Sequence, residues 1–215
     1  MSAQHKEKYY LLVCSVFCIA LLAARMVYTN TFEYRFMAVN LFLAWLPWIF
    51  SIWSLNLARR NMRWLMVITA FLWLIFFPNA PYMITDIFHL SEFPSMPMWY
   101  DLIMLLSFAW SGLLLGFYSL KKIFRLFKNQ RLVAHPVSIF AIFFICGTGI
   151  YLGRYERWNS WEIITRPKTL ITDMYYLLSD PAQVMHMISL SFLFAVFFTM
   201  VYIAVFRRLQ GETVS

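Results

Sequence analysis

The sequence predicts an all-α fold: a polytopic transmembrane helical bundle of about six spans, with an interfacial amphipathic helix on the outer side. Two observations predict it. Of the 215 residues, 62% are hydrophobic and only 13% are charged, whereas a soluble domain carries about 25% charged residues. Several apolar runs also reach the roughly 20 residues that a helix needs to cross a bilayer. Because so few charges cannot cover a water-soluble surface, we expect residues 1–215 to form a single integral membrane domain.

Six apolar runs are the expected spans. They cover approximately residues 9–28, 36–57, 64–85, 99–120, 132–152 and 181–206. The first run is longer than the apolar core of a typical secretory signal and shows no A-x-A cleavage site, so we expect it to be retained as a span. Asp180 and Pro181 predict the start of the last helix, with the aspartate as N-cap and the proline at the first helical position.

The basic residues predict the orientation of the spans. Twelve of the eighteen Lys and Arg residues fall at the N-terminus, around 59–63, in 121–131 and at 207–208, while eight of the ten acidic residues fall in the other segments. Lysine and arginine concentrate in cytoplasmic loops. We therefore expect a multi-pass protein of the bacterial inner (cytoplasmic) membrane with both termini in the cytoplasm. The net charge of +8 follows this loop pattern, so we expect the lipid bilayer, and no nucleic acid, as a partner.

The third span is expected to break near residues 78–81, at Pro78-Asn79-Ala80-Pro81. Each proline removes a backbone donor and disfavours helix in the preceding residue. Broken helices at membrane depth persist where they are buried in protein or line a wet cavity, and transporters place binding sites at such breaks. The break therefore predicts either a ligand site that includes Asn79 or a structural kink toward an interfacial loop.

Asp86 and His89 follow the break and lie three residues apart, so a helix would place them on one face. This spacing suits a carboxylate that orients an imidazole, which makes the pair the catalytic or proton-active candidates. Two ligands do not make a zinc site. Glu92, Asp101 or His186 could complete one, but we assign no metal ligands, and the sequence identifies no cofactor. The alternative role is a hydrogen-bonded pair at the membrane interface.

A second polar cluster, residues 149–161, holds Arg154, Arg157 and Asn159 beside Trp158 and Trp161. Paired guanidinium groups suit phosphate or carboxylate, so these three residues and Asp101 are further ligand-binding candidates. Simple anchoring at the headgroup level is the alternative. Pro167 then opens an amphipathic run that we expect to lie along the outer surface. Its apolar stripe is Leu170, Ile171, Met174, Tyr175 and Leu178.

Two Gly-x-x-x-Gly pairs, Gly112/Gly116 and Gly149/Gly153, permit close helix packing. They serve either internal packing or a homo-oligomer or membrane partner, and the spacing does not choose between these roles. Cys14, Cys18 and Cys146 lie inside apolar runs, where cysteine acts as a small hydrophobic residue.

Four segments also resemble one family. They are FPNAPYMITDIFHL (77–90), WYD (99–101), FAWSGLLLG (108–116) and GIYLGRYERWNSW (149–161). Together they resemble the bacterial integral membrane proteins of domain-of-unknown-function family 1361, from about Asn40 to the last span. The resemblance implies a small bacterial multi-pass protein and no particular reaction.

The leading functional hypothesis is an outward-facing polar pocket that binds or transports an anionic or lipid-like ligand, such as a lipid headgroup. Asp86 and His89 would be proton-active, and the arginines would hold the anion. One alternative is an intramembrane enzyme acting on lipid-linked substrates, for which no nucleophile stands out. Another is a non-catalytic membrane accessory subunit. These hypotheses leave open whether the protein is an enzyme.

Overall fold

A computed structural model describes residues 3–90, 92–93, 95–127, 135–158, 160 and 162–211. Every regular element in these residues is a helix, and six of the helical segments are long and apolar enough to cross a membrane. The predicted all-α polytopic bundle is thus confirmed. The chain divides into two compact units, Met1–Leu126 and Phe127–Ser215, and each is described by itself. The expectation of a single domain stays a prediction.

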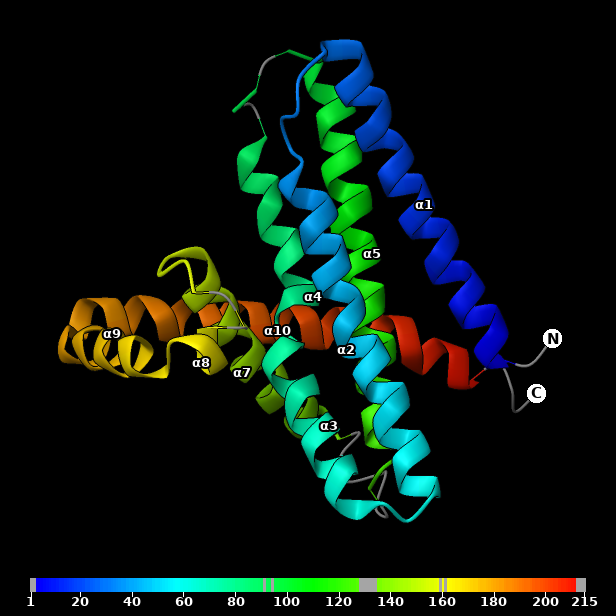
Figure 1. Ribbon diagram of the computed structural model, residues 1–215, viewed down its shortest axis with the longest axis vertical. Helices are drawn as coiled ribbons and strands as arrows, with labels where there is room; N and C mark the ends of the chain where they lie inside the picture. The colour runs from blue at the N-terminus through cyan, green and yellow to red at the C-terminus, as the bar shows by residue number, and fades with distance from the viewer. Residues whose placement is uncertain are drawn as a thin grey trace. The chain divides into compact units, whose positions relative to one another are not determined.

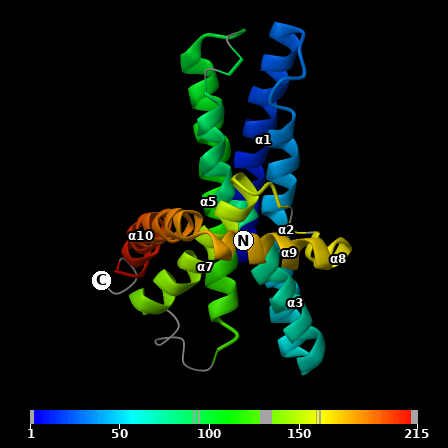
Figure 2. The ribbon, with the colours of Figure 1, turned by 90° about the vertical axis from the view of Figure 1, so that its left-hand side faces the viewer.

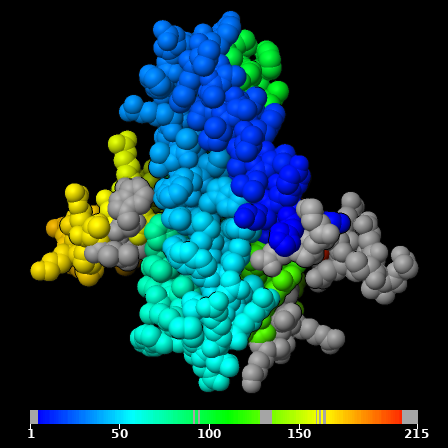
Figure 3. Space-filling view, turned by 45° about the vertical axis from the view of Figure 1, so that its right-hand side comes forward, coloured from blue at the N-terminus to red at the C-terminus, as the bar shows by residue number. Residues whose placement is uncertain are grey.

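The first unit is built around one central helix, α5 (Met98–Phe124). The helices α1 (Ala3–Thr29) and α2 (Phe36–Arg59) run beside it in Figure 1, and both contact it. More than half of α5 is buried, including Met104, Leu105 and Phe108. The outward-facing side chains of α1 and α2, which cover the face in Figure 3, include many exposed apolar residues. Such a surface suits contact with lipid tails.

The third span changes its helix type at the prolines. The helix α3 (Arg63–Phe76) ends just before Pro78. A single turn, α4 (Asn79–Tyr82), follows, and the chain continues as a 3₁₀-helix, η1 (Met83–His89). Together these elements form one span, Arg63–His89. The break therefore lies inside the span, and Asp86 and His89 lie at its end.

Gly112 and Gly116 of α5 make room for this break. A Cβ atom on Gly112 would overlap the carbonyl oxygen of Ala80, and one on Gly116 would lie 3.4 Å from Pro81 Cδ. Without side chains, the two glycines let the α4 backbone approach α5 closely. This Gly-x-x-x-Gly face thus serves internal packing within the first unit. A partner at Gly149/Gly153 stays a prediction.

Side-chain hydrogen bonds connect the helices of the first unit at intermediate depths. Cys18 of α1 lies 3.2 Å from the Ser111 hydroxyl of α5, and the indole of Trp73 in α3 donates to Ser119 of α5 over 3.0 Å. In an apolar surrounding these bonds give each helix pair a defined register.

The second unit is a pair of long helices with a short arm. The helices α7 (Pro136–Arg154) and α10 (Pro181–Gly211) pack on each other. Gly147 of α7 lies against the backbone of Ser191 in α10, and the hydroxyls of Thr148 and Ser191 lie 3.2 Å apart. Between them come α8 (Glu162–Thr165) and α9 (Pro167–Ser179). The predicted start of the fifth span at residue 132 lies outside the described residues.

The N-cap predicted for the last helix is confirmed. The backbone N–H of Ala182 donates to Oδ1 of Asp180 over 2.9 Å, and Pro181 is the first residue of α10. The amphipathic run predicted from Pro167 is a helix as well, α9, whose inner side includes the buried Leu177.

We predict that Gly112→Ala destabilises the protein by about 1–3 kcal/mol, as overpacking of a filled core does. Gly116→Ala is the matched control, because its new methyl group would make ordinary contacts with Ala80 and Pro81. Thermal unfolding in detergent, followed by size-exclusion chromatography, measures both variants. Equal melting temperatures for the two variants would contradict the close approach at Gly112.

We also predict that Ser111→Cys forms a disulfide with the native Cys18, because the two side chains already touch. Ser107→Cys is the control, since Ser107 bonds only to the Ile103 carbonyl of its own helix. Blocking of free thiols by a polyethylene-glycol maleimide after denaturation, with and without reductant, counts the cysteines that have paired. A full count of free thiols in oxidised Ser111→Cys would show that α1 packs elsewhere.

Candidate functional site

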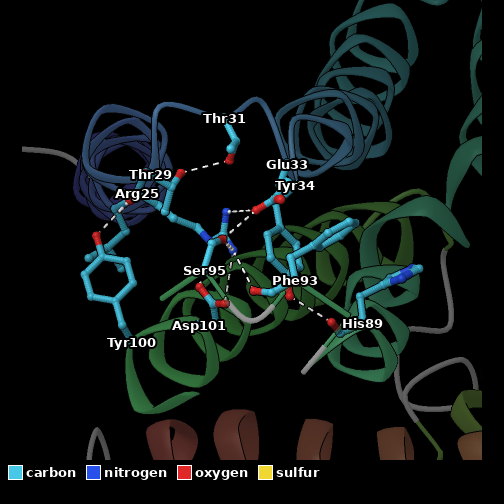
Figure 4. Close-up of polar contacts among 11 residues, drawn as sticks. Arg25, Thr29, Thr31, Glu33, Tyr34, His89, Phe93, Ser95, Tyr100 and Asp101 are labelled. Carbon is cyan, nitrogen blue, oxygen red and sulfur yellow. Dashed lines mark hydrogen bonds and ion pairs between the residues drawn. The ribbon is translucent and has the colours of Figure 1, made fainter. Parts of the chain in front are cut away.

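Four elements of the first unit come together at one end of the bundle. There α1 ends, α2 begins, η1 ends and α5 begins. Polar side chains from these elements and their connections gather as Figure 4 shows. We call Arg25, Glu33, Tyr34, Ser95 and Asp101 the Arg25 cluster.

The guanidinium of Arg25 is completely buried and lies at the centre of this cluster. Its Nε donates to Asp101 Oδ1 over 2.7 Å, and Nη1 donates to Glu33 Oε2 over 2.9 Å. Nη2 donates to the Phe93 carbonyl and the Ser95 hydroxyl, each over 3.1 Å. An arginine fork matched by two carboxylates is the strong, geometrically specific form of an ion pair. The cluster thus joins α1 and α5 to both of the intervening connections.

Tyr34 extends the cluster toward η1. The Arg25 guanidinium carbon lies 4.6 Å from the centre of the Tyr34 ring, a cation–π geometry. The Tyr34 hydroxyl donates to the His89 carbonyl oxygen over 2.7 Å. One tyrosine therefore couples the buried cation to the end of the broken span.

The environment also shifts the pKa of two groups in the connection before α2. The hydrogen bond from Ser95, followed by that from Arg25, lowers the pKa of the Glu33 carboxyl. Burial raises the pKa of Tyr34 to about 12, so the phenol stays protonated and can donate to His89. A lowered carboxyl pKa means that Glu33 stabilises the fold above its ordinary pKa, and that this contribution is lost as the pH falls.

A long basic side chain near the end of a span, such as Arg25, is expected to reach toward the interface and solvent. The structure corrects this, since Arg25 points into the bundle toward Asp101. A usable signal was present, because Arg25 and Asp101 are opposite charges inside spans and lie near the same predicted end. Glu33, Tyr34 and Ser95 are in connections and carried no such signal.

Asp86 is also buried, and its partner comes from α2. The Asn40 amide donates to Asp86 Oδ2 over 2.9 Å, and Asp86 is 1% exposed. Asn79, in the break itself, donates to the Phe76 carbonyl at the end of α3 over 3.0 Å. This bond caps a carbonyl that the helix leaves open, the role expected at a helix end. Its ligand role stays a prediction.

His89 reaches the surface of the first unit beside Glu92. Its Nδ1 atom lies 2.6 Å from Glu92 Oε2, and the two side chains are 23% and 49% exposed. The imidazole also packs against the Phe36 ring at 5.0 Å between ring centres. A carboxylate on Nδ1 fixes the orientation of the ring. This pair is partly exposed, whereas Asp86 and Asp101 are enclosed.

The remaining predicted site residues belong to the second unit or lie outside the described residues. Arg154 is in the last turn of α7, and Arg157 is exposed with a left-handed backbone, φ 58°. The N–H of Trp158 donates to the Leu152 carbonyl over 3.1 Å, which closes the end of α7. Asn159 is not among the described residues. The predicted convergence of these residues with Asp86 stays a prediction.

Metal ligation finds no support within the part of the chain that the structure describes. Among those residues no group of three His, Cys, Asp or Glu side chains could hold a metal ion. Asp101, which was weighed as a metal ligand, bonds to Arg25.

Comparison with known proteins identifies one family. A family model described as "Protein of unknown function (DUF1361)" matches residues 39–204, well over half of the chain. The resemblance seen in the four sequence segments is thus confirmed. The match includes α4, η1 and α5, and it begins after α1. No curated protein and no solved structure matches the chain.

We predict that Arg25→Gln destabilises the first unit by about 3–5 kcal/mol, because it leaves two carboxylates without their cation. The double variant Arg25→Met/Asp101→Leu removes both charges and should recover much of that loss. Arg35→Gln is the charge control, because Arg35 is an exposed arginine in the connection between α1 and α2. Thermal unfolding in detergent compares all three. An Arg25→Gln protein as stable as Arg35→Gln would contradict the central role of Arg25.

Proposed function

We propose that this chain, which belongs to the DUF1361 family, is a bacterial inner-membrane protein that binds an anionic, lipid-like ligand at its outer side. Both termini would lie in the cytoplasm. The six apolar helices support the membrane assignment. The Lys and Arg distribution supports the orientation, since most basic residues fall in the segments assigned to the inside.

The observation that supports a binding role is the difference between two polar groups at the outer end of the first unit. Arg25 is enclosed, and its hydrogen bonds go to Asp101, Glu33, Phe93 and Ser95, which makes that cluster part of the scaffold. His89 and Glu92 lie beside it and remain partly exposed. They follow a broken helix that is held inside the bundle, the setting in which membrane proteins place ligand sites.

The proposal names a separate set of candidate residues in each unit. Asp86 and His89 are the proton-active pair in the first unit, with His89 gaining or releasing a proton as the ligand binds. For the second unit, taken by itself, Arg154 and Arg157 are the candidate groups for an anion, because guanidinium groups form bidentate bonds with phosphate and carboxylate. Each set is tested by its own variants, so that one can fail without the other.

The contact between His89 and Glu92 also favours a second function, an intramembrane enzyme acting on lipid-linked substrates. A carboxylate that orients an imidazole is the arrangement of a general base. In that case purified protein would turn over a lipid-linked substrate, and His89→Gln would abolish turnover without lowering ligand affinity.

We predict that native mass spectrometry of the wild-type protein from mild detergent shows a retained lipid or small anion. Asp86→Asn and His89→Gln should lower its occupancy while expression holds, and so should Arg154→Gln with Arg157→Gln. Arg35→Gln is the control, since it removes an exposed basic charge outside the two sets. Asp86→Asn retains a group that can bond to Asn40, which protects the fold.

The outcomes separate the proposals. Loss of the adduct in the site variants but not in the controls supports binding. Equal adducts in folded wild-type and site variants would overturn the proposed sites. A bare mass in every sample, with strong dependence on a co-purified protein, would replace the binding proposal with a non-catalytic accessory subunit.

A further inference from the structure

The arm formed by α9 presents an apolar face that its own unit does not cover. Ile171, Tyr175 and Leu178 are spaced four and three residues apart, so they share one side of the helix. Their exposed fractions are 71%, 69% and 57%. The neighbouring stripe, Leu170, Met174 and Leu177, is buried or half-buried. The apolar arc is therefore wider than the packing within the unit requires.

A polar stripe of α9 lies next to this apolar face, with Thr172 directly after Ile171 and Ser179 one turn beyond Tyr175. Lys168, Thr172 and Ser179 are exposed there. The hydroxyls of Thr172 and Ser179 return to carbonyls of their own helix, at 3.1 and 2.7 Å. Arg166 and Lys168 add exposed positive charge at the first turn. One apolar arc, one hydroxyl-lined arc and a basic end are the features of a helix that lies in a membrane interface.

The short link to α10 holds the end of α9 at the depth at which α10 begins. Only Asp180 separates α9 from α10, and its carboxylate caps the first turn of α10 through Ala182. The first turns of α10 already expose apolar side chains, Met185 and Ile188, as a lipid-facing span does. The two helices diverge from their joint in Figure 2. The 13 residues of α9 extend about 20 Å, too short to cross a bilayer core of about 30 Å.

We infer that the Ile171–Tyr175–Leu178 face of α9 is a docking surface for the phospholipid interface where α10 enters the membrane. The acyl–headgroup boundary takes the apolar arc, the exposed lysine and arginine lie at the level of the lipid phosphates, and the hydroxyl arc faces water. This inference goes beyond the proposed ligand site and does not depend on it.

The test places a single spin label on the apolar face or on the neighbouring polar stripe of the arm. In a variant whose cysteines Cys14, Cys18 and Cys146 are replaced by alanine, one cysteine is introduced at Ile171 or Leu178. Thr172→Cys and Ser179→Cys are the matched controls on the same helix. The labelled proteins are reconstituted in vesicles of phosphatidylethanolamine and phosphatidylglycerol, and collision with oxygen and with a water-soluble nickel chelate is measured.

The inference predicts that labels at 171 and 178 collide mainly with oxygen, which concentrates in the lipid, and that labels at 172 and 179 collide mainly with the nickel chelate. Equal access of the chelate to all four positions would overturn it. Shielding of 171 and 178 from both reagents would assign the face to a protein partner instead. Spin–spin coupling that disappears on dilution with unlabelled protein would assign it to a second copy.

The unmodified chain provides a second measurement, should the cysteine-free variant fail to fold. Vesicles that contain a diazirine phospholipid are illuminated, and the adducts are located by mass spectrometry. Adducts are expected on Ile171, Tyr175 and Leu178 as well as on the exposed side of α10. Labelling of α10 at Phe192 with none on α9 would overturn the inference.

Discussion

A guanidinium with no exposed surface sets the arrangement of the first unit. Arg25 lies in an apolar helix, so its charge is stable only where anionic groups surround it. Asp101 and Glu33 meet this requirement, and Ser95 and the Phe93 carbonyl accept the remaining hydrogen bonds. Because these partners come from α5 and from two connections, satisfying one side chain fixes the positions of four segments. The Tyr34 hydroxyl donates to the His89 carbonyl oxygen, so the position of His89 depends on the same cluster.

A second buried cation, also paired with a carboxylate, lies at the other end of α5. Lys122 is buried and forms an ion pair with Glu7 of α1, whose Oε1 also accepts the Trp48 indole N–H over 2.8 Å. The helix α1 is thus tied to α5 by a charge pair at each end and by Cys18 in between. The family match begins after α1, yet Asp101 and Lys122 within it need charges that α1 supplies. We conclude that α1 is an integral helix of the first unit, because it supplies the charges that pair with Asp101 and Lys122.

The features that the sequence predicted best are those determined by local chemistry. Apolar length located the spans, the two prolines located the break, and Asp180 with Pro181 located the start of α10. The interaction partners of these side chains were harder to predict, because they depend on which helices are neighbours in the fold. Asp86 and His89 were placed after the break in the third span, but Asn40 and Glu92 as their partners required the fold. Gly112 and Gly116 could be recognised as a close-packing face, while the fact that Ala80 and Pro81 fill it could not.

The charges at the Arg25 end of the first unit bear on the proposed binding of an anion. Residues 25–35 and 86–101 of the first unit contain two arginines and four acidic residues, and Arg25 is already bonded to two of those acids. An anion would meet net negative charge there unless His89 were protonated. This charge balance disfavours direct contact between an anion and the first unit. It follows that ligand binding lost on removal of Arg25 would report a disturbed scaffold, whereas binding lost at His89 or Arg157, both of which reach the surface, would report contact with the ligand.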